Sequence, residues 1–138
     1  MLIYPVLDLR CNSESYHRSA TGFGLTRDMM EYFVRQYAGR ADVTDWHLSP
    51  GLCEHLEGVA PALVVVAGFD PLHAEGLAYA QQLSAAGVRA TLIDFARQIH
   101  GFVAMGQFVD EAGAAILFCG AALRQALQDP AVTGRSER

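Results

Sequence analysis

The chain has 138 residues, the length of one ordinary globular domain. Apolar residues make up 51% of it and charged residues 18%, so it can bury a hydrophobic core and is neither disordered nor of low complexity. The net charge of −5 and the lack of any basic block argue against nucleic acid as a partner. No apolar run approaches the ~20 residues that span a bilayer, and no signal peptide is visible, so we expect no association with a membrane.

The cysteines and histidines give no sign of a crosslinked or metal-dependent protein. Neither the number nor the spacing of the cysteines suggests a disulfide framework or a zinc site, and we expect reduced thiols in a cytoplasmic protein. The histidines show no H-x-x-x-H spacing, and no glycine motif for phosphate binding is present. The sequence therefore predicts no metal and no organic cofactor. The three cysteines are Cys11, Cys53 and Cys119.

The first predicted element is a buried strand over residues 2–7, where the apolar run is unbroken. The polar, glycine-bearing stretch over residues 8–25 predicts a long loop. Thr26 then has the character of a helix N-cap, and the apolar residues after it recur at helical spacing as far as Gly39. Residues 40–60 predict irregular structure.

A more regular unit follows. Residues 62–69 are rich in β-branched side chains and predict a second buried strand, which a helix over residues 71–86 follows. A third strand is predicted over residues 88–95, and a last helix over about residues 111–127. Alternating strands and helices predict an α/β fold with about three parallel strands joined by crossover helices. We expect a single domain over residues 1–138, with a disordered tail from residue 129.

Two residues of catalytic character follow neighbouring predicted strands. Asp70 comes directly after the second strand, and His100 lies in the loop after the third. Because functional groups gather at the carboxyl ends of parallel strands, we expect both side chains at one edge of the sheet. Each alone has a more ordinary interpretation, Asp70 as a turn residue and His100 as a structural histidine. Together they predict a carboxylate that orients an imidazole acting as a general base.

Ordered motifs along the chain identify a family. In this order and at these intervals they resemble the C-terminal half of the hormone-sensitive-lipase family of α/β-hydrolases, over nearly the whole chain. The resemblance implies that Asp70 is the catalytic acid and His100 the general base of a serine carboxylesterase, which cleaves small esters through an acyl-enzyme. The motifs are Leu2-Ile3-Tyr4-Pro5, Ser49-Pro50, Asp70-Pro71-Leu72, Glu75-Gly76, Ala86-Gly87-Val88 and His100-Gly101-Phe102.

The nucleophile of that family is absent from the sequence. The family's H-G-G-G oxyanion hole and G-D-S-A-G-G nucleophile elbow lie before the L-I-Y-P strand, and no serine of this chain sits in G-x-S-x-G. The sequence therefore predicts the C-terminal portion of such an enzyme, forming part of an α/β-hydrolase domain, with the nucleophile and oxyanion hole outside it. The alternative is a catalytically inactive remnant or assembly subunit that keeps the hydrolase fold.

The first predicted strand also has a consequence for assembly. In the resembling family it pairs with the strand that leads into the nucleophile, so here it would be an exposed apolar edge, which invites pairing with another chain. We therefore expect a homo-oligomer, or a complex with a partner that carries the N-terminal half, rather than a stable monomer.

Two further groups have ordinary interpretations. Cys53 and His55 stand close in sequence, but near neighbours rarely face each other usefully, so we do not expect a thiol nucleophile there. Glu75 falls at the start of a predicted helix, where a carboxylate supports the first turn, and we expect that role rather than acid catalysis.

Overall fold

The computed structural model describes residues 1–128, so the predicted disordered tail lies outside the described residues. The chain forms two compact units: residues 2–101 are one, and the described part of the other is Met1 with residues 102–128. In chain order the elements are β1 (Leu2–Ile3), α1 (Glu14–Arg18), α2 (Arg27–Ala38), the 3-10 turn η1 (Pro50–Leu52), β2 (Ala62–Phe69), α3 (His73–Ala85), β3 (Ala90–Ile99), the 3-10 turn η2 (Phe102–Ala104) and α4 (Asp110–Gln128).

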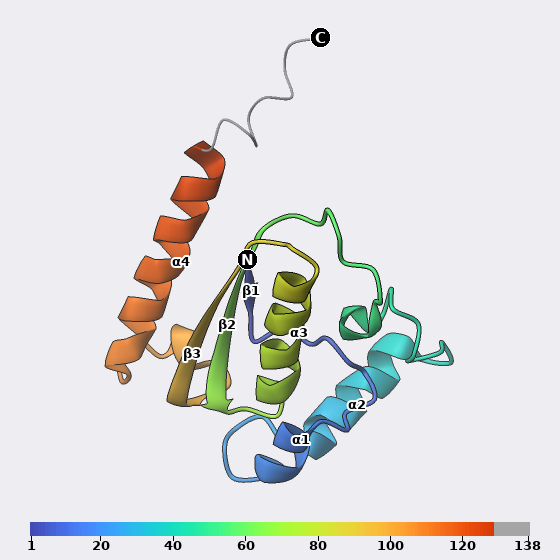
Figure 1. The fold of residues 1–138 in the computed structure, drawn as a ribbon. Coiled ribbons are helices and arrows are strands. Elements are labelled where there is room, and N and C mark those ends of the chain that lie inside the picture. Colours follow the sequence, from blue (N-terminus) through green and yellow to red (C-terminus); the bar gives the residue numbers. More distant parts are fainter. Residues whose placement is uncertain (129–138) are drawn as a thin grey trace. The chain divides into compact units, whose positions relative to one another are not determined.

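The three strands form one parallel sheet in the order β1-β2-β3 (Figure 1). The central strand β2 is buried over residues 63–67, as expected for an unbroken apolar run. Helix α3 crosses over between β2 and β3 and packs on one face of the sheet, where Ala80 meets Val64 and Val66. The predicted α/β class with three parallel strands is confirmed.

The predicted helices are present close to their expected limits. Thr26 caps α2 by accepting a hydrogen bond from the amide of Met29 at 3.2 Å. The helix ends at Ala38, because Gly39 follows with a φ of 57°, a conformation that favours glycine. Helices α3 and α4 correspond to the predicted ranges within two residues at each end.

The first strand is shorter than predicted. It spans only Leu2–Ile3, and Tyr4 adds one further hydrogen bond from its amide to the carbonyl of Val65 at 2.8 Å. Tyr4 has a φ of 41°, which lies outside the extended region, and Pro5 has no amide hydrogen to donate. The predicted strand over residues 2–7 is therefore wrong in length, because an apolar run does not reveal the bend in the backbone.

The stretch predicted as a loop over residues 8–25 contains helix α1. Ser15 and Tyr16 of this helix are completely buried. Tyr16 packs with Met30 of α2 and with Leu72 at the start of α3. The segment is therefore anchored at the carboxyl end of the strands (Figure 1) rather than forming an open loop.

Strands β2 and β3 change register near their carboxyl ends. Ala67 lies opposite Phe95, whereas Phe69 lies opposite Ile99, so β3 has two more residues than β2 in this interval. Such a bulge bends the strand and re-aims the residues that follow it. The third strand consequently continues to Ile99, past the predicted end at Phe95, and His100 follows it directly.

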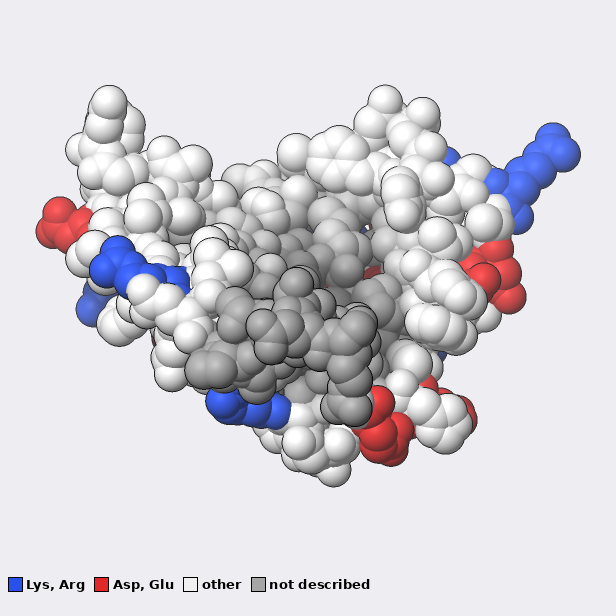
Figure 2. Space-filling view, turned by 90° about the horizontal axis from the view of Figure 1, so that it is seen from above, with Lys and Arg blue, Asp and Glu red and all other residues white. Residues whose placement is uncertain are grey.

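The face drawn in Figure 2 shows no concentrated charge, and no described helix is suited to cross a membrane. Figure 2 shows basic and acidic side chains dispersed around the margin of one face, with uncharged residues between them. Within residues 1–128, no helix combines the length and the hydropathy needed to cross a bilayer.

Gly68 lies at the bulge and allows the two strands to approach closely there. A Cβ atom built on Gly68 would lie 2.0 Å from the carbonyl oxygen of Ala96, so no side chain fits between the strands. We expect Gly68→Ala to lower the free energy of unfolding by about 2–3 kcal/mol or more in urea denaturation. The matched variant is Gly120→Ala in α4, where nothing lies within 4 Å of the added carbon. That change should be neutral or stabilise by up to about 1 kcal/mol, and an equally small effect at Gly68 would contradict the close approach.

Candidate active site

The bulge determines which residue of β3 faces Asp70. Asp70 directly follows β2, and His100 directly follows β3. In the register that pairs Ala62 with Ala90, Asp70 would lie beside Gln98. The two additional residues of β3 bring His100 to that position instead. Both residues therefore lie at the carboxyl edge of the sheet, as predicted. The register change brings their side chains into contact.

Asp70 and His100 are in direct contact. Nδ1 of His100 lies 2.8 Å from Oδ2 of Asp70. Because a carboxylate only accepts hydrogen bonds, Nδ1 is the donor, and Nε2 of the neutral ring then carries a lone pair. The Asp70 side chain is 1% exposed and that of His100 is 30% exposed. The structure thus combines a buried carboxylate with a partly exposed imidazole, and no other described residue hydrogen-bonds Nε2.

The second oxygen of Asp70 holds the turn between β2 and α3. Oδ1 accepts a hydrogen bond from the amide of Leu72 at 2.9 Å, and the backbone carbonyl of Asp70 accepts one from the amide of His73 at 3.1 Å. This is the local bonding expected of an aspartate in a turn. Asp70 is therefore both a turn residue and the partner of His100, since each role uses a different oxygen.

His100 also contacts an aromatic ring, that of Tyr4. The ring of Tyr4 packs against it, with 4.8 Å between the ring centroids and a tilt of 50°. Gly101 follows with a φ of 82°, a conformation that glycine adopts readily and that turns the chain away from the strand. The imidazole thus has two contacts, the hydrogen bond from Nδ1 to Asp70 and the tilted ring of Tyr4.

No serine hydroxyl within residues 1–128 is hydrogen-bonded to His100. Ser15 and Ser49 bind backbone groups, and the hydroxyl of Ser84 donates to the carbonyl of Ala80 in its own helix. Ser136 lies outside the described residues. At Cys53, the sulfur contacts the backbone carbonyl of His55 at 3.2 Å and not its ring, so these residues do not form a thiol–imidazole pair.

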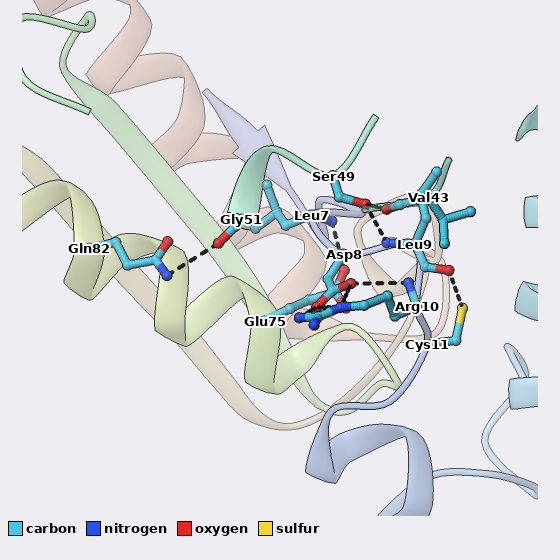
Figure 3. Close-up of polar contacts among 10 residues, drawn as sticks. All are labelled: Leu7, Asp8, Leu9, Arg10, Cys11, Val43, Ser49, Gly51, Glu75 and Gln82. Atoms are coloured by element: carbon cyan, nitrogen blue, oxygen red, sulfur yellow. Dashed lines mark hydrogen bonds and ion pairs between the residues drawn. The ribbon is translucent and has the colours of Figure 1, made fainter. Parts of the chain in front are cut away.

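Glu75 is a buried carboxyl group rather than a surface residue of the first helical turn. It is 7% exposed, and its Oε1 accepts a hydrogen bond from the amide of Leu7 at 2.7 Å (Figure 3). It therefore ties α3 to the segment that follows β1. Burial raises the pKa of Glu75 from 4.5 to about 8, against the opposing effect of the backbone amides of Leu7 and Asp8.

The expectation that Glu75 only supports its helix is therefore incomplete. A signal was present in the sequence, because Glu75 shares a helical face with Leu72 and Tyr79, three residues before and four after it. An acidic residue on an apolar face indicates a buried carboxyl group with a specific partner.

The raised pKa of Glu75 predicts how stability depends on pH. The folded chain holds a proton on Glu75 between about pH 4.5 and 8 that the unfolded chain releases, so this residue's contribution to stability is lost as pH rises through that interval. Glu75→Gln keeps an acceptor for the Leu7 amide and removes the titration. We expect its free energy of unfolding to decline less between pH 5 and pH 8 than that of the unsubstituted chain. Glu57→Gln, at an exposed position, should leave the decline unchanged, and identical declines in all three proteins would contradict the assignment.

Comparison with known proteins identifies the family. A family model described as the α/β-hydrolase fold matches residues 1–104. The chain belongs to this family. It is 38% identical over 128 residues to the ethyl acetate hydrolase of Pseudomonas putida. The match covers 92% of this chain and 40% of that protein. It is 43% identical over 108 residues to the carboxylic ester hydrolase LipN of Mycobacterium tuberculosis, over 77% of this chain and 29% of that protein.

Solved structures agree with this assignment. EstE1, a thermophilic carboxylesterase cloned from a metagenomic library, matches with a TM-score of 0.86 and 38% identity, over 92% of this chain and 44% of that one. The resemblance to carboxylesterases of the hormone-sensitive-lipase type is confirmed, and the chain belongs to a family of hydrolases. It spans about two fifths of the length of ethyl acetate hydrolase and of EstE1.

Proposed function

We propose that this chain supplies the acid–base pair of a serine carboxylesterase that cleaves small carboxylic esters. The observation that carries the proposal is the 2.8 Å contact between His100 and the completely buried Asp70 at the carboxyl edge of the sheet. In this proposal the nucleophilic serine and the oxyanion hole come from residues outside the 138-residue chain. The names of the relatives, an ethyl acetate hydrolase among them, support a small ester as the substrate.

The proposed reaction gives a role to each ring nitrogen of His100 and to the Asp70 carboxylate. Nε2 of His100 takes the proton of the serine hydroxyl as the serine oxygen attacks the ester carbonyl. The imidazolium then gives that proton to the leaving alkoxide, which departs as the alcohol and leaves the acyl-enzyme. In the second half of the reaction, His100 takes a proton from water as the water attacks the acyl-enzyme. The proton then returns to the serine oxygen, and the carboxylic acid is released. Asp70 remains ionised throughout, keeps the hydrogen on Nδ1 and stabilises the imidazolium. This reaction uses no metal and no organic cofactor.

The free side of β1 is the proposed contact with the rest of the enzyme. β1 is at the edge of the sheet, and Ile3, one of its two residues, is 36% exposed. Such an edge can accept a further strand. We propose that it pairs with a partner carrying the N-terminal half or with a second copy of the chain, and that the protein acts in the cytoplasm, where its free cysteines stay reduced.

A chimeric enzyme tests the proposal. The part of the Pseudomonas putida ethyl acetate hydrolase that precedes its match to this chain is joined in front of Leu2, and hydrolysis of a short-chain p-nitrophenyl ester is measured. We expect activity, with His100→Ala and Asp70→Asn each lowering kcat/KM by at least about 10³-fold.

The matched control for the chimera is His47→Ala. His47 also contacts a carboxylate, with 2.8 Å between its Nδ1 and Oδ1 of Asp45, but in an exposed loop. It should keep full activity. A chimera whose activity survives His100→Ala would refute the assigned base, and a folded but inactive chimera would favour the inactive remnant.

The isolated chain gives a complementary prediction. We expect no covalent adduct in its intact mass after treatment with a fluorophosphonate probe, because no serine within residues 1–128 is hydrogen-bonded to His100. One adduct that disappears in His100→Ala would show that a serine of this chain is the nucleophile.

A further inference from the structure

Ser15 of α1 is buried against the turn that carries Asp70. It is completely buried, and its hydroxyl donates a hydrogen bond to the carbonyl of Pro71. The same oxygen accepts a hydrogen bond from the amide of Ala74 at 3.0 Å and lies 3.1 Å from the hydroxyl of Ser13. A hydroxyl has one hydrogen and two lone pairs, so these three contacts use its full capacity.

These contacts replace a missing helix cap. α3 begins after Leu72, which has no side chain that can cap the helix, so its first amides need partners from elsewhere. Ser15 satisfies Ala74, and Oδ1 of Asp70 satisfies Leu72 itself. Ser15 therefore binds the carbonyl of the Pro71–Leu72 peptide, whose own amide holds the Asp70 carboxylate, and the amide of Ala74 two residues further on.

Arg18 extends the same contact to the other side of Asp70. Its guanidinium donates to the carbonyl of Gly68 at 3.3 Å and lies 3.1 Å from Nδ1 of His73. Arg18 is exposed, so these bonds contribute less than those of Ser15. Helix α1 thus hydrogen-bonds the backbone on both sides of Asp70, through Arg18 before it and through the buried Ser15 after it.

We propose that Ser15 is a positioning residue for Asp70: it fixes the turn from which Oδ2 is directed at Nδ1 of His100. The inference rests on the proposed function of that pair, but it is tested without any enzymatic activity. If the ester-hydrolysing chimera fails, the assignment of Ser15 still stands or falls on the measurement below.

The test is the proton between His100 and Asp70, observed by NMR in the ¹⁵N-histidine-labelled chain. A resonance far downfield that is lost in His100→Gln identifies this proton. We expect Ser15→Ala to speed its exchange with water by about two- to tenfold, since the variant loses the hydrogen bonds that hold the turn. Ser15→Thr, which keeps a hydroxyl, should restore slow exchange. If the alanine variant does not fold, Ser15→Cys keeps the volume with a weaker donor and should give the same acceleration.

Ser49→Ala is the matched control. Ser49 is also completely buried and has two backbone bonds, donating to the carbonyl of Val43 at 2.6 Å and accepting from the amide of Leu9 at 2.9 Å (Figure 3). Neither partner belongs to the Asp70 turn. We expect Ser49→Ala to lower the free energy of unfolding about as much as Ser15→Ala, while the proton exchanges as in the unsubstituted chain.

Three results would overturn the proposal. The first is a destabilised Ser15→Ala with unchanged exchange, which would make Ser15 a structural residue only. The second is equal acceleration in Ser49→Ala, which would attribute the effect to general loosening. Absence of the resonance from the unsubstituted chain would contradict the Asp70–His100 pair itself and overturn both proposals.

Discussion

The candidate site depends on the change of register between β2 and β3. A regular ladder would bring Gln98 beside Asp70, and the two additional residues of β3 bring His100 there instead. The bulge in turn depends on Gly68, because the carbonyl of Ala96 occupies the space that a Cβ atom would need. A backbone contact between two strands, rather than an attraction between the two side chains, therefore sets the geometry of the acid and the base.

The structure around Asp70 serves stability and the site at the same time. The start of α3 has no local cap, and its amides are satisfied by Asp70 and by Ser15 from a distant segment. Glu75, one turn further along, binds the backbone after β1. Each of these groups satisfies a buried polar partner, which the fold requires in any case. The direction of the Asp70 carboxylate follows from the same bonds.

The sequence predicts the main architecture and the proximity of Asp70 and His100, because both follow from repeating patterns. Apolar runs separated by helical periodicity predict three parallel strands, and the carboxyl ends of neighbouring strands predict that Asp70 and His100 are close. The bulge, helix α1 and the end of β1 are set by single contacts. Ser15 lies in a polar stretch, and its partners Pro71 and Ala74 are more than fifty residues away. Nothing in a local pattern predicts such a contact, nor the bend at Tyr4.

The most direct measurement is the ¹⁵N NMR spectrum of the His100 ring in its neutral form, which distinguishes the two tautomers. With Asp70 accepting the hydrogen bond, the hydrogen resides on Nδ1 and Nε2 is bare. We expect the Nδ1–H tautomer in the unsubstituted chain, and its loss in Asp70→Leu, which cannot accept a hydrogen bond. A ring protonated at Nε2, or one insensitive to Asp70→Leu, would contradict the pairing on which the proposed esterase function rests.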